Sequence, residues 1–229
     1  MIRLALLPLV LSAVPATGAE KRVAVGSFDR VRVNGPFEVT YAVGSPNARL
    51  SGDRQVIERV EMRVDGTTLT IRNRQGGDER SVASQSEPVK VTLSSPSLTS
   101  AAVFAGGRLS ATQLRGTRVD LSISGAGTVA VADVAADQLN ATVIGTGTVT
   151  LAGRAARARY VMNGAGRIDA GKLDAGDVSV LLDGPGEIAA AARYDARITN
   201  TGLGAVSIAG TPRCTVRARG GGPVACSGR

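Results

Sequence analysis

Apolar and polar residues alternate along most of the chain, and this alternation predicts strands rather than helices. Within residues 31–33 and 37–41, valine and aromatic side chains recur at every second position, on either side of the turn signal Asn-Gly-Pro at 34–36. Residues 62–73 predict a second strand pair, because the Asp65-Gly66 dipeptide inside them favours a tight turn. The N-terminal strands are expected to cap or begin the architecture that follows.

Three further N-terminal segments complete this region. Residues 53–63 are interpreted as an irregular coil that leads into the strand pair, with one or two helical turns as the alternative. Residues 76–87 are polar and aperiodic, which favours a mobile loop. Residues 89–103 alternate again and predict a strand before the regular part of the chain.

A small-Gly-x-Gly phrase repeats at intervals of about 20 residues through the second half of the chain. Its glycine pairs are Gly125 and Gly127, Gly145 and Gly147, Gly164 and Gly166, Gly184 and Gly186, and Gly202 and Gly204. Degenerate copies end at Gly107 and Gly222. Two residues after the second glycine of each copy stands an apolar side chain, namely Leu109, Val129, Val149, Ile168, Ile188, Val206 and Val224. A second such column follows two residues later, and both columns should face one interior.

Later in each repeat a second alternating run appears. Its apolar members are Val119, Leu121 and Ile123; Leu139, Ala141 and Val143; Ala158, Tyr160 and Met162; and Val178, Val180 and Leu182. The residues between them are mostly polar and should point outward, except Val161 and Leu181, which make the outer face locally apolar. Each repeat therefore predicts two short strands separated by turns. Glycine suits the first turn because a tight reversal needs positive φ or close backbone approach.

The predicted fold is all-β, a parallel β-solenoid whose coils of about 20 residues are too short to hold a strand, a crossover helix and loops. The competing interpretation is an antiparallel sandwich. The solenoid is favoured because the apolar columns keep phase over seven copies and the chain contains only three Phe, three Tyr and no Trp. We expect one solenoid domain over residues 20–229, with N-terminal strands and a cap in 20–100 and regular coils with a C-terminal cap in 101–229. The basic segment 211–220 suits that C-terminal cap.

The first 19 residues are typical of a secretory signal peptide. Arg3 precedes an apolar run over residues 4–14, and small residues precede Glu20. The alternative, a buried N-terminal segment, is disfavoured because prolines at positions 8 and 15 interrupt the stretch. No second apolar stretch approaches the ~20 residues that would span a bilayer. An exported protein of the periplasm or cell surface is therefore expected.

The two cysteines, Cys214 and Cys226, are expected to form a disulfide that clips the end of the fold. A zinc site is a poor alternative, because two cysteines without any histidine leave the tetrahedral ligand set incomplete. The absence of histidine also removes the commonest general base and catalytic-triad member. No cofactor and no metal are expected.

A net charge of +8 favours anionic partners such as lipopolysaccharide or acidic glycans, although an excess of charge also serves solubility. Candidate anion-binding residues are Arg154, Arg157, Arg159, Arg213, Arg217 and Arg219. Nucleic acid is disfavoured because exported proteins rarely meet it and aromatic side chains for base stacking are few.

A search for catalytic groups finds one alternative, a carbohydrate-active enzyme that uses an acidic edge at Asp169, Asp174, Asp177 and Asp183, next to Glu187. Against it, counting along the repeats places no two acids in one column of adjacent coils. Asp120 is expected to stack on Asn140, and Asn163 on Asp183. Ser124 has no histidine to activate it, so no catalytic residue is assigned. Tyr160 and Tyr194 could stack on sugars, but Tyr160 falls in the inward phase and is expected in the core.

Several segments in their order resemble one family of secreted bacterial proteins, the putative auto-transporter adhesin head GIN domain. They are "FDRVRVNGPFEVTYAVG", "VEMRVDGTTLTIRN", "VKVTLSSPSLTSAAV" and the run "SGAG", "IGTG", "NGAG", "DGPG" and "TGLG", which together cover residues 28–213. This resemblance implies a right-handed β-helix, similar in shape to pectate lyases but without a recognised catalytic set, and a role in adhesion. It supplies no binding residues, and the C-terminal cysteine pair and Arg-rich end depart from the pattern.

Residues and resemblance together predict a non-enzymatic exported scaffold at the Gram-negative surface or in the periplasm. It would bind an envelope polymer, a glycan or a protein along one face of the solenoid. The oligomeric state is not predicted.

Overall fold

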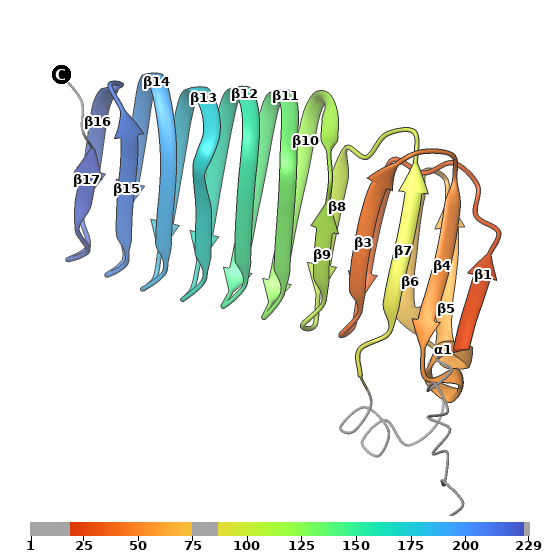
Figure 1. Ribbon diagram of the computed structural model, residues 1–229. Helices are drawn as coiled ribbons and strands as arrows, with labels where there is room; N and C mark the ends of the chain where they lie inside the picture. Colours follow the sequence, from red (N-terminus) through yellow and green to blue (C-terminus); the bar gives the residue numbers. More distant parts are fainter. Residues whose placement is uncertain (1–18, 75–86, 227–229) are drawn as a thin grey trace, which may run out of the picture.

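The computed structural model describes residues 19–74 and 87–226, which form a right-handed parallel β-solenoid (Figure 1). The predicted signal peptide, apart from Ala19, and the predicted loop at 76–87, apart from Glu87, lie outside the described residues. The elements are β1 Ala19–Val23, β2 Arg30–Asn34, β3 Glu38–Val43, β4 Asn47–Gly52, α1 Arg54–Arg59, β5 Val60–Asp65, β6 Thr68–Asn73, β7 Lys90–Ser95, β8 Ser100–Phe104, β9 Arg108–Ala111, β10 Leu114–Gly125, β11 Thr128–Gly145, β12 Thr148–Asn163, β13 Arg167–Asp183, β14 Glu187–Asn200, β15 Ala205–Gly210, β16 Arg213–Ala218 and β17 Val224–Cys226.

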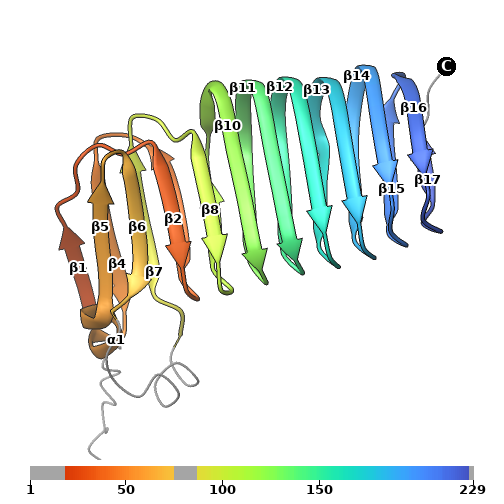
Figure 2. The same ribbon diagram turned by 180° about the vertical axis from the view of Figure 1, so that it is seen from behind.

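The coils have two broad faces. The front face, nearer the viewer in Figure 1, contains β4, β7, β3, β9, the first parts of β11 to β14, β15 and β17. The back face, seen in Figure 2, contains β5, β6, β2, β8, β10, the later parts of β11 to β14, and β16. Successive coils pair in parallel with side chains in register, so that Val129 lies beside Val149 on the front and Leu139 beside Ala158 on the back. This parallel pairing confirms the solenoid and excludes the antiparallel sandwich.

The interior is filled by the predicted apolar columns. Leu109, Val129, Val149, Ile168 and Ile188 are all fully buried, and the runs on the back face are buried in the same way. Because strand side chains alternate, each coil adds one layer of aliphatic residues between its two faces. Tyr160 lies in this interior, as its phase predicted.

The Gly-x-Gly turns form the lower edge in Figure 1, and the two glycines of a phrase serve different needs. Gly145 has a backbone φ of +113°, a conformation that residues with a side chain rarely adopt. Gly147 has an ordinary φ, but a Cβ added there would lie 2.5 Å from Ile123 Cγ2 and 3.0 Å from the Gly127 carbonyl oxygen. The positive φ of the first glycine therefore permits the reversal, and both glycines permit close stacking, since a Cβ at Gly145 would itself lie 2.8 Å from the Gly125 carbonyl oxygen.

The opposite edge differs from the prediction of a second turn. β11 runs without a break from Thr128 to Gly145, through the corner and onto the back face. A register shift between Val131 and Val134 marks a β-bulge at the corner. A bulge bends a strand while preserving most of its hydrogen bonds, so the chain changes face here without leaving the sheet. The expectation of two separate strands per coil was wrong for β11 to β14.

The N-terminal strands are arranged out of sequence order. β2 lies between β6 and β8, and β3 lies between β7 and β9, with parallel pairing on each side. β2 and β3 thus form a complete coil inside the stack, and among the described residues β1, β4, β5 and α1 cover the N-terminal end of the stack (Figure 1). The turn between β2 and β3 is a further copy of the repeat, in which Phe37 stands where other copies have the second glycine.

The segment 53–63 is not an irregular coil, and this expectation was wrong. Its first part forms α1, because the Asp53 side chain caps the helix by accepting hydrogen bonds from the backbone N–H groups of Gln55 and Val56 at 2.8 and 3.2 Å. Ile57 is the buried residue of this short helix. The predicted hairpin follows, with β5 antiparallel to β6 and Gly66 at φ +59° in its turn.

A disulfide joins Cys214 to Cys226, with Cα atoms 6.4 Å apart. Cys214 lies in β16 on the back face and Cys226 in β17 on the front face, so the bond crosses the interior of the last described coil. Segment 211–220 supplies β16, and Val216 is 45% exposed there. The disulfide therefore takes the place that aliphatic pairs occupy in earlier coils.

Candidate functional site

Outward-pointing side chains of the back face line up in rows, because each coil stacks in register on the one before. The row nearest the bulged edge, here called the corner row, contains Arg118, Gln138, Arg157, Asp177, Asp195 and Arg213. The next row, here called the central row, contains Ser100, Asp120, Asn140, Arg159, Ser179, Arg197 and Thr215. The third row contains Ser122, Thr142, Val161, Leu181 and Thr199.

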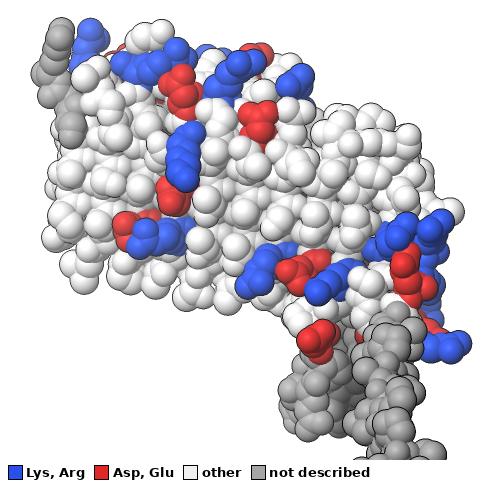
Figure 3. Space-filling view, in the orientation of Figure 1, with Lys and Arg blue, Asp and Glu red and all other residues white. Residues whose placement is uncertain are grey.

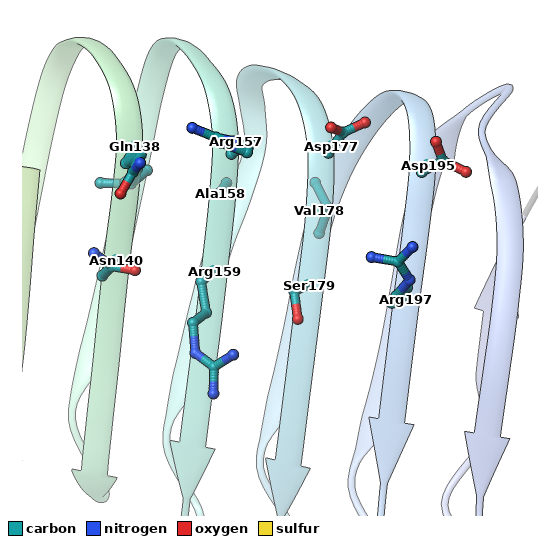
Figure 4. A pocket seen from close by; sticks show the side chains of 11 residues that line it. Gln138, Asn140, Arg157, Ala158, Arg159, Asp177, Val178, Ser179, Asp195 and Arg197 are labelled. Atoms are coloured by element: carbon teal, nitrogen blue, oxygen red, sulfur yellow. The ribbon is translucent and has the colours of Figure 1, made fainter. Parts of the chain in front are cut away.

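A shallow open groove of about 360 Å³ follows the corner and central rows across β11 to β14. Figure 4 shows its polar lining, with Arg159, Ser179 and Arg197 on three successive strands below Arg157 and Asp177. A second depression of about 370 Å³ continues the groove toward β10 and β8 and shares Asn140 and Arg159 with the first. The two depressions together give a trough that runs along the solenoid axis.

The charges of the trough are paired most closely at its β10 end. Near β10, Asp120 accepts hydrogen bonds from Arg118 Nε at 3.0 Å and from Asn140 Nδ2 at 2.9 Å. Toward β14, the outward guanidinium groups of Arg157, Arg159 and Arg197 form no ion pair with any residue in the described ranges 19–74 and 87–226. These three arginines can therefore contact an anion without first breaking an internal pair.

The six arginines proposed from the sequence do not form one patch. Arg157 and Arg159 line the groove, whereas Arg154 lies near the corner, in register with Asp174. Arg213 approaches Asp195 at 4.0 Å, and Arg217 and Arg219 extend along and beyond β16. Sequence reasoning missed Arg197, which the register of β13 and β14 brings to the groove beside Ser179.

The model of the family "Putative auto-transporter adhesin, head GIN domain" matches residues 27–212. The chain belongs to this family. Its fold is shared by solved structures of bacterial proteins. A "putative adhesin" from Bacteroides fragilis has a TM-score of 0.84 and 21% identity over 91% of this chain and 96% of that one. A "Putative lipid binding protein" from Parabacteroides distasonis has a TM-score of 0.71 and 16% identity over 92% of this chain and 96% of that one. A "putative adhesin" from Parabacteroides merdae has a TM-score of 0.69 and 16% identity over 92% of this chain and 96% of that one.

No curated protein shows a significant match to this head GIN domain chain. Helices that could cross a bilayer are absent from the described ranges 19–74 and 87–226. The family and the solved relatives are described as adhesins or as lipid-binding, and their descriptions name no enzyme.

The acids proposed for an enzymatic edge are dispersed in this head GIN domain. Asp169 lies on the front face and accepts from its own turn at Gly171, and Asp174 pairs with Arg193 at 3.0 Å at the corner. Asp183 lies at the glycine edge, where Thr201 Oγ1 donates to it at 3.3 Å. Only Asp177 lies in the groove. The nearby Glu187 pairs with Arg167 on the front face.

The expectation that no two acids share a column was nevertheless wrong. Asp177 in β13 lies in register with Asp195 in β14, and both line the groove. Bulges between Ala170 and Asp177 shift the register, so counting residues from the preceding glycine did not align the two aspartates. Arg157 and Arg213 flank the pair in the corner row, which places opposite charge on both sides of it. The predicted stacking of Asp120 on Asn140 and of Asn163 on Asp183 is confirmed.

The front face differs in character from the back face. Figure 3 shows a broad central area there with few charged side chains. Its outward residues in one row are small except for Asp169, and the small members are Ala130, Thr150, Ala189 and Ser207. The Arg167 and Glu187 side chains that do occur on this face pair with each other across β13 and β14. Arg108 on β9 is also exposed on the front face, but the back-face groove is the stronger candidate for a charged ligand because it gathers Arg157, Arg159 and Arg197.

The two tyrosines considered as sugar platforms have opposite environments. Tyr160 is fully buried and its hydroxyl has no hydrogen-bond partner among the described residues. Burial raises the pKa of this hydroxyl well above its ordinary value. Tyr194 is 63% exposed at the corner, directly before Asp195, and the Arg193 guanidinium lies 5.3 Å from its ring centre. Only Tyr194 presents a ring to solvent at the edge of the groove.

Proposed function

We propose that this head GIN domain protein is a non-enzymatic, exported binding scaffold of the adhesin type, which holds an anionic glycan of the cell envelope in the back-face groove. The observation that carries the proposal is the outward display of Arg157, Arg159 and Arg197 in one trough, with no ion-pair partner among the residues that the structure describes. Guanidinium groups suit carboxylates and phosphates because their planar donors bind two oxygens at once. Membership of an adhesin family supports a partner at a surface.

The strength expected of such a site is modest for each contact. An exposed ion pair contributes about 0.2–1 kcal/mol, so three arginines cannot give tight binding to a single small anion. A polymer that engages several arginines at once gains affinity through multivalency. The open form of the groove and its extension along several strands support a chain-like ligand.

Export is part of the same proposal. The signal-like segment 1–19 and the disulfide at the C-terminal end both favour an oxidising compartment outside the cytoplasm. Cleavage before Glu20 would leave β1 intact except for Ala19. We place the protein in the periplasm or on the surface of a Gram-negative cell.

The experiment is a binding screen of the chain from Glu20 onward against envelope polymers and acidic glycans at two salt concentrations. Arg157→Gln/Arg159→Gln/Arg197→Gln should lose most of the binding, because it removes the unpaired charges of the groove. Arg108→Gln is the matched control for one charge, since Arg108 lies on the front-face strand β9. Binding that is salt-insensitive, or equal in the triple variant and the control, would sink the proposal.

A second candidate, a glycan-cleaving enzyme, is favoured by the adjacency of Asp177 and Asp195. Retaining glycosidases hold two carboxylates about 5 Å apart, and neighbouring strands lie about 4.8 Å apart. The groove is open to solvent and offers no enclosed cleft around the pair. Assaying released sugar with the unmodified chain and with Asp177→Asn/Asp195→Asn separates the two functions, since binding without turnover fits only the scaffold.

A further inference from the structure

The central row sets at a fixed distance two arginines that form no ion pair within the described part of the chain. Arg159 in β12, Ser179 in β13 and Arg197 in β14 are successive partners in the parallel register. Because neighbouring strands lie about 4.8 Å apart, the backbone positions of Arg159 and Arg197 are about 10 Å apart along the solenoid axis. Figure 4 shows both side chains on the groove surface with Ser179 between them.

We propose that the ligand is an extended acidic polysaccharide with a carboxylate on each sugar, lying along the solenoid axis with Arg159 and Arg197 on two carboxylates of the same side. In an extended chain of this kind, neighbouring sugars face opposite ways, so carboxylates on one side recur at every second sugar. This repeat of two sugars matches the two strand-to-strand steps that separate Arg159 from Arg197. This inference rests on the function proposed above and specifies its ligand.

The neighbouring rows fit a sugar polymer better than a simple polyanion. Asp177 and Asp195 in the corner row repel further anionic groups, but their carboxylates accept hydrogen bonds from sugar hydroxyls. Val161 and Leu181 in the third row offer apolar surface to the C–H faces of sugar rings, and Leu181 is 36% exposed. Ser179 offers a hydroxyl between the two arginines. The groove therefore combines charge, hydrogen-bond acceptors and apolar surface in parallel rows.

The direction of the ligand follows from the trough. The two depressions share Asn140 and Arg159, so the groove continues along the axis from β14 to β10. At the β10 end the charge of Asp120 is offset by Arg118, which removes a repulsive group from the path of an acidic chain. A ligand lying parallel to the strands, along a single coil, would meet only one arginine of the central row.

The test moves one arginine while keeping the net charge. Ser179→Arg/Arg197→Ser places the two arginines one rung apart, whereas Arg197→Ser alone removes one of them. Binding of the chain from Glu20 onward to oligouronates of increasing length is measured by calorimetry, with a neutral oligosaccharide of the same linkage, poly-glutamate and anionic lipid vesicles as comparison ligands.

We expect Arg197→Ser to weaken oligouronate binding roughly two- to fivefold. The swapped variant, Ser179→Arg/Arg197→Ser, should bind as weakly as Arg197→Ser. Affinity should rise steeply once the oligomer is long enough to reach both arginines. If the swapped variant recovers full binding, or if poly-glutamate or vesicles bind as well as the uronate, the spacing argument is overturned while anion binding by the groove stands. If no anionic ligand binds and the Arg157→Gln/Arg159→Gln/Arg197→Gln variant equals the unmodified chain, both proposals fail. Circular dichroism of each variant verifies that it has folded.

Discussion

Replacement of Gly147 by alanine tests the account of how one turn stacks on the next. Gly147 has an ordinary backbone conformation, so the alanine would suffer only from lack of space. Its Cβ would lie 2.5 Å from Ile123 Cγ2 and 3.0 Å from the Gly127 carbonyl oxygen. Overpacking of this kind costs about 1–3 kcal/mol, and the reduced flexibility of the unfolded chain returns about 0.4–1 kcal/mol.

The difference between these two ranges is about 0–2.6 kcal/mol, and the contact of 2.5 Å favours a net loss of roughly 1–2 kcal/mol within it, in the free energy of unfolding. For a protein of this size, 1 kcal/mol corresponds to about 2–4 °C in Tm, so Gly147→Ala should lower the Tm by about 2–8 °C. Thermal unfolding followed by circular dichroism measures this shift. Urea denaturation on the same samples shows whether the loss is spread over the stack or confined to a few coils.

Gly171→Ala is the matched control, because a Cβ there meets nothing closer than Asp169 Oδ1 at 3.6 Å and the backbone φ is also ordinary. It should be neutral or slightly stabilising. A double-mutant cycle with Ile123→Ala adds a second check, since removing Cγ2 should reduce the cost of Gly147→Ala. If Gly147→Ala is as stable as the control, the close-stacking explanation for the second glycine is refuted.

Three other changes probe separate features. Cys214→Ser/Cys226→Ser should lower stability by up to about 3 kcal/mol and raise hydrogen exchange in β16 and β17, because the bond closes a loop with a sequence separation of 12. Tyr160→Phe should preserve or raise stability by roughly 1 kcal/mol, because the buried hydroxyl has no partner, as measured by urea unfolding at neutral pH. Since burial raises the folded-state pKa of Tyr160, its contribution is fully present below the ordinary value of 10.0 and is lost at higher pH, so the phenylalanine variant should lose less stability between neutral pH and pH values above 10.0. Asp53→Ala should cost about 1 kcal/mol through loss of the α1 cap, and Asp53→Asn should restore most of it.

The regular coils were predictable because two local rules act together in them. Val129 and Val149 follow their glycines at a constant interval, and the period of two gives the inward face directly. The groove was only partly predictable, because its members all follow a bulged corner whose length differs from coil to coil. Asp177 comes eleven residues after Gly166 and Asp195 nine after Gly186, so no fixed offset could align them.

The N-terminal region shows a different limit. The turn at Asn34-Gly35-Pro36-Phe37 is a repeat copy, but Phe37 replaces the glycine that marks the others, so the copy was hidden. A recognisable signal was the Val39 that follows it at the usual spacing and lies in register with Leu109. The helix α1 is too short to show a period, and only Asp53 signalled its start.

The inserted coil of β2 and β3 has a consequence for how the chain reaches its native state. Coils from β10 onward close on partners about 20 residues away, and such local contacts form quickly. β2 instead waits for β8, whose Ser100 pairs with Arg30, so this rung is completed only after the intervening chain has been synthesised and has turned back. The coil of β2 and β3 is thus synthesised before the strands on both of its sides, and its backbone groups stay unpaired until β6 to β9 have been made. Deletion of residues 30–43 would therefore remove an internal coil of the solenoid and leave the strands at its N-terminal end without their neighbours.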